Sequence, residues 1–414
     1  MHIVMTPVGS SGDVNPFVAI GRVLRRRGYD VTVLAPEVFE PVVSRAGLRF
    51  VPTESAEAFE RVTQDPDLWH PLRGMHLMFK LVGERLRESY ARLEAVYQPG
   101  RTVLVGHTLA FATRVFEEAN RVPAVTVQLA PSAFRSEFRQ PALPPDRDIS
   151  GWPRWLKRVM WWGVDRFMID RHILPALNPW RAELGLQPVS RIFKAWVNSP
   201  QHTLGLFPDW FGDPQPDWPP QLRLTGFVVG DGSGDETLDE DVRRFSEAGR
   251  PPIVFTPGSA NRQAPRFFDA AMDATIRLGW RALFVTPYRA QLPGTLPDSI
   301  LHVPYAPFAE LLPRCTAVVH HGGIGTCARG FGAGIPQIIM PMGFDQPDNA
   351  LRVSRLRAGA SIPPGRFTGP RVAAALERLL ADHGVAAACR RYKDSMRLDD
   401  AVGSACDHIE RAAR

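Results

Sequence analysis

Short apolar segments rich in β-branched residues alternate with amphipathic segments along the chain of 414 residues. The first half contains the runs "HIVMTPV", "DVTVLAP", "TVLVGH" and "AVTVQLAP", and the second half contains "PIVFTPGSA", "RALFVTP", "ILHVPY", "AVVHHGG" and "QIIMPM". Between the first two runs, Val18, Ile20, Val23 and Leu24 lie near one face of an expected helix. Apolar strands that alternate with helices predict parallel sheets covered on both faces. We therefore expect an α/β fold with doubly wound sheets.

Two domains are expected, because a chain of this length exceeds what one hydrophobic core usually organises. The apolar pattern is interrupted in "VGDGSGDETLDED", residues 229–241, where glycine, serine and acidic residues dominate. We therefore place one domain at residues 1–230 and a second at residues 231–395. Residues 396–414 are expected to form a terminal helix that packs back on the first domain.

Composition narrows the classes of protein. No apolar run reaches the roughly 18 residues of a spanning helix, and the amino terminus lacks the basic flank of a signal peptide, so we expect a soluble cytoplasmic protein. The formal net charge of +6 is carried by arginine. A basic chain can attract nucleic acid, an anionic membrane or a phosphorylated molecule. Because the arginines are scattered and no RNA- or DNA-reading pattern is present, we expect a solvated basic surface and no nucleic-acid partner.

The segment "HHGGIGT", residues 320–326, joins a buried strand to a helix. Small residues there let backbone N–H groups at the helix start point at an anion, and a diphosphate suits such a site. His320 or His321 can add a donor, and Thr326 can cap the helix or donate its hydroxyl. The expected anion contacts in this turn are His320, His321, Gly322, Gly323, Gly325 and Thr326.

Two other interpretations of this turn must be weighed. An isolated glycine turn most often serves only tight strand-to-helix packing. A metal site built on the two histidines is disfavoured, because adjacent strand residues point to opposite faces and no third ligand is spaced nearby. The four cysteines have no CxxC spacing, which also argues against zinc.

Flanking motifs decide between these interpretations. "HVPYAPFAELLP" precedes the glycine turn and "PMGFDQPDNA" follows it. With these three motifs in order, the chain resembles the nucleotide-sugar-dependent glycosyltransferases of family 1, which have the GT-B fold of two Rossmann-like domains facing across a cleft. The resemblance implies that the first domain binds the acceptor and the second binds the sugar donor, without a cofactor.

The resemblance assigns roles to individual residues. Tyr305 is expected to stack on the nucleobase and the main chain of Ala306 to hydrogen-bond it. Asp345 and Gln346 match the pair that holds sugar hydroxyls, and Ser259 matches a serine that touches the phosphates. The remaining donor contacts that we expect outside the glycine turn are Ser10, after the first strand, and Gly258.

The donor is inferred from a departure and from a closer likeness. Arg329 stands where plant members have a glutamate that grips both ribose hydroxyls, and a deoxyribose loses less by that change. Stretches such as "GSSGDVNPF", "RIFKAW" and "LFPDWF" are similar to rhamnosyltransferases that form rhamnolipids from hydroxy-fatty acids. We therefore expect dTDP-rhamnose, with UDP-glucose as the alternative.

Two residues are candidates for activating the acceptor. Asp13 occupies the position of the catalytic histidine of plant members, although an aspartate there can also simply cap the helix. His107 ends a strand at the position of the partner aspartate, so the two can form a dyad with exchanged members; a histidine satisfied by a backbone carbonyl is equally compatible. The DxD triplets at 65–67, 146–148 and 239–241 follow no buried strand, so we expect solvated acids and no metal requirement.

The acceptor is expected to be an apolar hydroxylated molecule such as a hydroxy-fatty acid lipid, polyphenol, macrolide or sterol. Eight of the ten tryptophans lie between Trp152 and Trp218. Trp152, Trp155, Leu156, Val159 and Trp162 recur at helical spacing beside basic residues, which fits a core helix, a lipid-facing acceptor cleft or peripheral contact with a membrane surface. An epimerase of the same build and a non-catalytic binding protein are the remaining alternatives.

Overall fold

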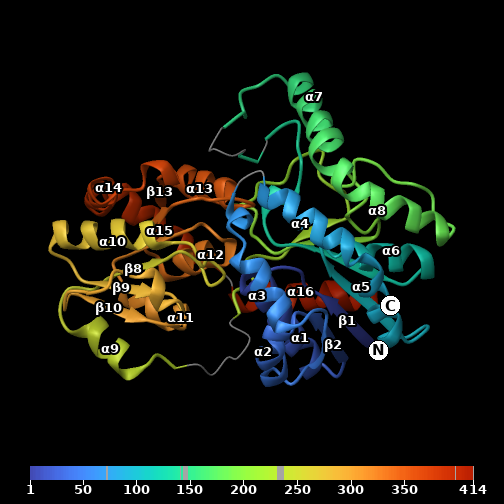
Figure 1. Cartoon of the computed structure of the whole chain (residues 1–414), viewed down its shortest axis with the longest axis horizontal. Helices are drawn as coiled ribbons and strands as arrows, with labels where there is room; N and C mark the ends of the chain where they lie inside the picture. Colours follow the sequence, from blue (N-terminus) through green and yellow to red (C-terminus); the bar gives the residue numbers. More distant parts are fainter. Residues whose placement is uncertain (71–72, 140, 143–147, 231–236, 397, 414) are drawn as a thin grey trace. The chain divides into compact units, whose positions relative to one another are not determined.

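The computed structural model describes residues 1–70, 73–139, 141–142, 148–230, 237–396 and 398–413. These residues form two compact units (Figure 1). The first unit takes in residues 1–142, residues 148–230 and the C-terminal helix, and the second takes in residues 237–396. The centre of the linker predicted from the sequence, residues 231–236, lies outside the described residues.

The first unit is built on a seven-stranded sheet of order β3-β2-β1-β4-β5-β6-β7. All strand pairs are parallel. The central strands are buried along their whole length, because helices cover both faces. The strands are β1 (His2–Thr6), β2 (Asp30–Ala35), β3 (Arg49–Pro52), β4 (Thr102–His107), β5 (Ala124–Gln128), β6 (His202–Gly205) and β7 (Leu222–Leu224).

The helices of the first unit connect these strands. They are α1 (Ser11–Arg26), α2 (Glu40–Arg45), α3 (Ala56–Gln64), α4 (Arg73–Glu84), α5 (Leu86–Val96), α6 (Phe111–Asn120), α7 (Arg154–Val164), α8 (Asp170–Glu183) and α16 (Leu398–Ala412). A π-helical turn, Asp165–Ile169, joins α7 to α8.

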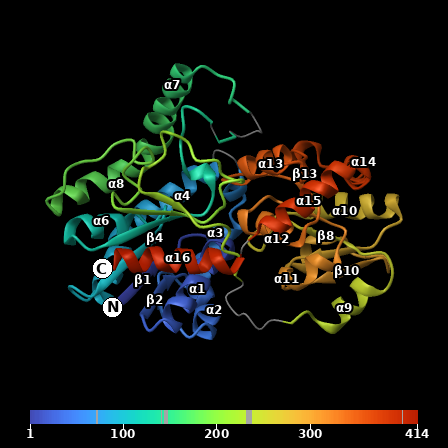
Figure 2. The same cartoon turned by 180° about the vertical axis from the view of Figure 1, so that it is seen from behind.

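The C-terminal helix α16 lies beside α1 (Figure 2). Ala405 and Ile409 are fully buried, and the Sγ atom of Cys406 donates to the carbonyl of Ile20. At the surface, Arg27 donates to Asp407 over 2.6 Å and to Glu410 over 3.1 Å. Apolar burial and these charge pairs together fix the end of the chain on the first unit.

The second unit repeats the architecture with a six-stranded parallel sheet of order β10-β9-β8-β11-β12-β13. Its strands are β8 (Ile253–Thr256), β9 (Ala282–Val285), β10 (Ile300–Val303), β11 (Ala317–His320), β12 (Gln337–Ile339) and β13 (Gly359–Ser361). Its helices are α9 (Glu240–Glu247), α10 (Pro265–Leu278), α11 (Phe308–Leu311), α12 (Ile324–Ala333), α13 (Gln346–Arg355), α14 (Gly369–Ala381) and α15 (His383–Ser395).

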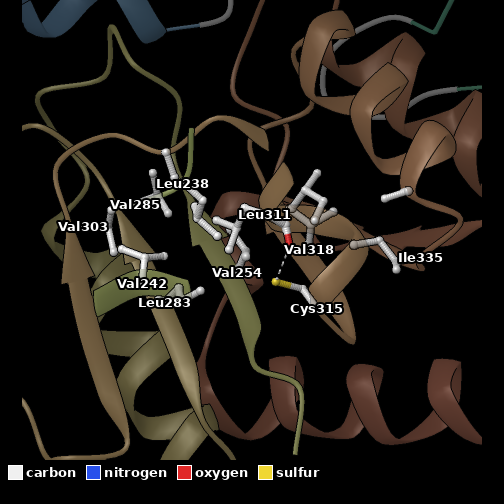
Figure 3. Close-up of a cluster of buried hydrophobic side chains, with 13 residues drawn as sticks. Leu238, Val242, Val254, Leu283, Val285, Val303, Leu311, Cys315, Val318 and Ile335 are labelled. Atoms are coloured by element: carbon white, nitrogen blue, oxygen red, sulfur yellow. Dashed lines mark hydrogen bonds between the residues drawn. The ribbon is translucent and has the colours of Figure 1, made fainter. Parts of the chain in front are cut away.

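An apolar cluster on one face of this sheet holds strands and helices together (Figure 3). Val254 of β8, Leu283 of β9 and Val318 of β11 are fully buried against Leu311 of α11. The Sγ atom of Cys315 donates to the Leu311 carbonyl over 3.2 Å, so even the thiol is satisfied. This packing fixes the strands whose ends carry the expected donor site.

Two doubly wound parallel sheets confirm the predicted α/β fold class. None of the helices in the described part of the chain is long and apolar enough to cross a membrane. The interpretation of the tryptophan-rich helix as core is wrong for most of its stripe, since Trp152, Trp155, Val159 and Trp162 are exposed. Only Leu156 of the five is half-buried.

Candidate active site

Three loops meet at the carboxyl edge of the second sheet. Strand β11 pairs with β8 on one side and with β12 on the other. The loops after these strands therefore emerge side by side, and they carry the PGSA, HHGG and FDQ segments. Ligands of doubly wound folds bind at this edge.

His320, at the end of β11, holds the glycine turn from inside. The backbone N–H of Gly322 donates to Nδ1 over 3.1 Å, and Nε2 lies 3.0 Å from Oε1 of Gln337. Nε2 therefore carries the ring proton and donates it to that amide oxygen. Burial lowers the pKa of His320 to about 3, so the ring is neutral. Both ring nitrogens are used within the protein.

His321 directly follows β11, and its ring lies close to two glycines. A Cβ at Gly258 would lie 2.8 Å from the Cε1 atom of the ring, and a Cβ at Gly323 would lie 2.6 Å from its Nε2. Gly258 also has φ +96, which favours glycine. The imidazole of His321 therefore fits only because Gly258 and Gly323 have no side chains.

A ring nitrogen of His321 lacks a partner. Nδ1 is buried and makes no hydrogen bond within the part of the chain that the structure describes. Burial also lowers the pKa of His321 to about 4, so the ring is neutral near pH 7 and has one N–H to donate. An orphaned buried nitrogen costs free energy unless a ligand satisfies it.

Backbone N–H groups at the start of α12 complete the turn. The amides of Thr326 and Cys327 already donate to the Gly323 carbonyl. Those of Gly323, Ile324 and Gly325 have no acceptor within the described residues. Unpaired amides at a helix start attract anions.

The loop after β12 is tied to the glycine turn by an asparagine. Asn349 Nδ2 donates to the Gly322 carbonyl over 2.9 Å and to Asp345 Oδ2 over 2.7 Å. Gln346 Oε1 accepts from the amides of Met342 and Gly343. The Gln346 Nε2 group makes no hydrogen bond within the described chain, so it can serve a ligand.

The loop after β8 is anchored in the same way. Asn261 is almost fully buried, and its Nδ2 lies 3.5 Å from the Sδ atom of Met342. Gln291 accepts from the Ala264 amide and donates to the Asn261 carbonyl. Sequence reasoning missed Asn261, Gln291, Gln337 and Asn349, which hold the loops that carry the expected contacts.

Other predicted donor residues lie at the same edge. Ser259 is exposed after β8, Tyr305 is 59% exposed after β10, and Ala306 behind it is buried. Strand β10 lies three positions from β11, which corresponds to about 14 Å at the usual strand spacing. Thr326 lies half-buried in the first turn of α12.

In the first unit, Asp13 lies just after β1, at the third position of α1. Its Oδ2 atom accepts from the Ser10 amide over 2.7 Å and from the Ser10 hydroxyl over 3.1 Å, so the carboxylate does cap the helix. Ser10 is thereby engaged by Asp13. Burial raises the pKa of Asp13 to about 6, against the lowering effect of the two Ser10 hydrogen bonds.

His107 ends β4, the strand beside β1, so it shares the carboxyl edge with Asp13. Its Nδ1 accepts from the Leu109 amide over 3.3 Å, and burial lowers its pKa to about 4. The ring is therefore neutral, with its proton on Nε2. The described chain contains no hydrogen bond between Asp13 and His107.

The described residues contain no group of three or more histidine, cysteine or acidic side chains that could hold a metal. Asp65 and Asp239, from two of the DxD triplets, accept hydrogen bonds from amides at the starts of helical turns. Asp146, of the third triplet, lies outside the described residues. Metal independence stays a prediction.

Comparison with known proteins identifies the enzyme class. Residues 3–138 match the glycosyltransferase family 28 N-terminal domain, and residues 283–402 match the erythromycin biosynthesis protein CIII-like C-terminal domain. The O-mycaminosyltylonolide 6-deoxyallosyltransferase of Streptomyces fradiae is 31% identical over an alignment of 437 positions, which covers 99% of this chain and 97% of that protein.

Solved structures show the same fold. The glycotransferase of kitacinnamycin superposes with a TM-score of 0.77 at 21% identity, covering 100% of this chain and 99% of that one. A spinosyn rhamnosyltransferase complexed with thymidine diphosphate superposes with a TM-score of 0.69 at 19% identity, covering 98% of this chain and 100% of that one. The chain therefore belongs to the family 28 and EryCIII-like glycosyltransferases of GT-B fold, as a nucleotide-sugar-dependent enzyme of the natural-product type.

Proposed function

We propose that this glycosyltransferase moves a 6-deoxyhexose, with rhamnose favoured, from a dTDP-linked donor to a hydroxyl of an apolar small molecule. The observation that carries the proposal is the anion site at the start of α12. Three backbone amides without acceptors and the orphaned Nδ1 of His321 lie together there. A departing diphosphate needs this kind of fixed, neutral donor.

Diphosphate binding falls to His321 in this proposal, because both ring nitrogens of His320 are used within the protein. His320 instead shapes the turn. Tyr305 would stack on the thymine at the other end of the donor, with the Ala306 main chain hydrogen-bonding the base and Ser259 touching the phosphates. The sugar hydroxyls would meet Asp345 and the free Nε2 group of Gln346.

The preference for a deoxyribose donor rests on two supports. Arg329 replaces the glutamate that would grip a ribose 2′-hydroxyl in plant members. The spinosyn rhamnosyltransferase is described with thymidine diphosphate, and the Streptomyces fradiae relative is named for a 6-deoxysugar. The likeness of sequence stretches to rhamnolipid-forming enzymes adds rhamnose. UDP-glucose is the alternative donor.

Asp13 would act as the base. The acceptor oxygen attacks the anomeric carbon, the bond from that carbon to the diphosphate oxygen breaks, and the acceptor proton passes to the Asp13 carboxylate, with inversion at the carbon. A pKa of about 6 makes Asp13 a better proton acceptor than an ordinary aspartate while leaving it ionised near pH 7. His107, whose pKa is about 4, is a poor base and would act as a neutral Nε2–H donor that orients the acceptor.

Thermal denaturation with dTDP and with UDP tests the donor. A ligand that binds only the folded state stabilises it by about 2.7 kcal/mol at a hundred times its Kd. We expect a larger shift in melting temperature with dTDP than with UDP at equal concentrations. An equal or larger shift with UDP would reject the dTDP donor.

Product analysis tests the reaction. Incubation of dTDP-rhamnose with hydroxylated apolar acceptors should release dTDP only when an acceptor is present, and the product should have the inverted anomeric configuration by NMR. Conversion of the donor sugar without an acceptor would indicate an epimerase. Tight dTDP binding with no dTDP release across lipid, polyphenol, macrolide and sterol acceptors would contradict a transferase of this scope.

A further inference from the structure

Helix α7 has large apolar side chains on its outer side and a buried lysine on its inner side. Trp152, Trp155, Val159 and Trp162, with Phe167 of the following π-helical turn, are between 43% and 64% exposed. We call these five residues the α7 stripe. Because Trp155, Val159 and Trp162 are four and three residues apart, they share one helix face. Figure 1 shows α7 extending from the first unit with its principal contact at the turn that follows it.

Contacts on the inner face fix this orientation. Lys157 is almost fully buried, and its Nζ donates to the carbonyls of Phe138 and Ser150, each over 2.8 Å. The Arg135 guanidinium lies over the Trp161 ring, with its Cζ atom 4.6 Å from the ring centroid. A buried ammonium is tolerated only with hydrogen bonds like these, so rotating α7 to hide the α7 stripe would strand it. The exposed side is therefore a property of the folded unit.

Cations gather beside the α7 stripe. Arg158 forms two hydrogen bonds with Glu137 over 2.7 and 2.6 Å, and Arg154 lies 3.9 Å from the same carboxylate. Lys194 is exposed and also acts electrostatically on Glu137. Three cations thus surround one acid. Arg166, between Trp162 and Phe167, is exposed and has no ion pair within the described residues.

The acids of the same region face inward. Asp165 is fully buried, where it pairs with Arg135 and, over 2.9 Å, with Arg191. The Asp170 carboxylate accepts from the Arg191 amide over 2.7 Å. Neither acid offsets the positive charge at the surface. The outer side of α7 therefore combines exposed tryptophans with net positive charge.

We propose that the α7 stripe and its flanking cations dock the enzyme on the surface of an anionic lipid bilayer. Amphipathic helices of this composition lie in the interface, with aromatic rings at the acyl boundary and basic groups at the lipid headgroups. A second copy of the chain fits less well, because a symmetric contact would bring the same cations together. A small acceptor needs a concave site, whereas this surface runs for about 18 Å along a helix.

Sedimentation with vesicles tests the docking. The full chain should co-sediment with vesicles that contain phosphatidylglycerol, bind pure phosphatidylcholine weakly, and dissociate as salt is raised. The double variant Trp155→Ser, Trp162→Ser should bind at least about tenfold more weakly, because it removes two indoles of which roughly half is exposed and available to enter the lipid. Arg166→Gln should lose about fivefold on anionic vesicles.

The matched control is Ile276→Ser on α10 of the second unit, which removes a side chain of comparable exposure at 57%. It should bind vesicles like the wild type. Thermal melts of all variants check folding, and sedimentation velocity without lipid checks self-association. The proposal is wrong if the wild type ignores anionic vesicles or if the double variant binds them like the wild type. A dimer that the double variant dissociates, without vesicle binding, would assign the surface to a second copy.

Discussion

Replacing Gly323 with alanine should displace the His321 imidazole without altering the backbone. Gly323 has φ −59 and ψ 140, which alanine adopts without strain. The new Cβ would lie 2.6 Å from Nε2 of His321 and 3.2 Å from Cε1. Ordinary contact begins at 3.4 Å, so the ring must withdraw by about 0.8 Å.

Displacement of the His321 ring should weaken thymidine diphosphate binding, because the hydrogen bond from the ring to the diphosphate is lost. A hydrogen bond to a charged group contributes about 1.5–3 kcal/mol, so its loss should weaken thymidine diphosphate binding by about 10- to 150-fold. The folding cost is smaller, because alanine for glycine at a helix N-cap costs at most about 1 kcal/mol. Binding should therefore fall far more than stability.

Isothermal titration calorimetry of thymidine diphosphate, with thermal melts, measures both quantities. The control is Gly332→Ala in the same helix, whose Cβ would meet only Met396 Cε at 3.8 Å. It should gain helix stability, up to about 1 kcal/mol, and keep wild-type affinity. Wild-type affinity in Gly323→Ala would refute the role of His321, and equal loss in both variants would show that α12 is merely sensitive to substitution.

Three further predictions concern Asp13 in the first unit and Asn349 in the second. Asp13→Asn should abolish transfer. It should also raise the free energy of unfolding by about 3 kcal/mol above pH 6, because a carboxyl whose pKa is raised from 3.8 to about 6 destabilises the folded state when it is ionised. Chemical denaturation should show this gain vanish below pH 4, and a gain that does not change with pH would contradict the raised pKa of Asp13. Because only the ionised carboxylate can accept a proton and its pKa is about 6, wild-type kcat/KM should fall tenfold per pH unit below about pH 6. A flat profile between pH 5 and 7 would exclude Asp13 as the base. Asn349→Ala should cost about 1–3 kcal/mol in urea unfolding, because it removes the two hydrogen bonds from Asn349 Nδ2 to the Gly322 carbonyl and the Asp345 carboxylate. Ser354→Ala in the same helix is the control, and unchanged stability in both variants would show that the asparagine does not tie the loops.

The fold could be predicted where the strands are apolar throughout. All nine runs identified in the sequence form strands, eight of them at inner positions of the sheets and the ninth as edge strand β10. Strands β3, β6, β7 and β13 were missed. They have three or four residues, lie towards the sheet edges, and take their extended form from pairing with a neighbour, so their own sequence carries little signal.

The candidate site could be predicted only in its outline. Glycines and histidines in a turn indicated an anion site, but the sequence does not tell which of two adjacent histidines faces inward, because strand residues alternate between faces. His320 is the inner one, and its Nε2 lies 3.0 Å from Oε1 of Gln337 on the neighbouring strand β12. Asn261 and Asn349 were missed because a single polar residue acquires its role only from the distant loops it joins.

The central claim is that the amides at the start of α12, with His321, bind the diphosphate of the donor. A crystal structure of the chain with thymidine diphosphate measures this directly. We predict phosphate oxygens within hydrogen-bonding distance of the Ile324 and Gly325 amides and of the His321 ring, with thymine on Tyr305. Phosphates bound at any other part of the chain, with His321 left without a partner, would contradict the account.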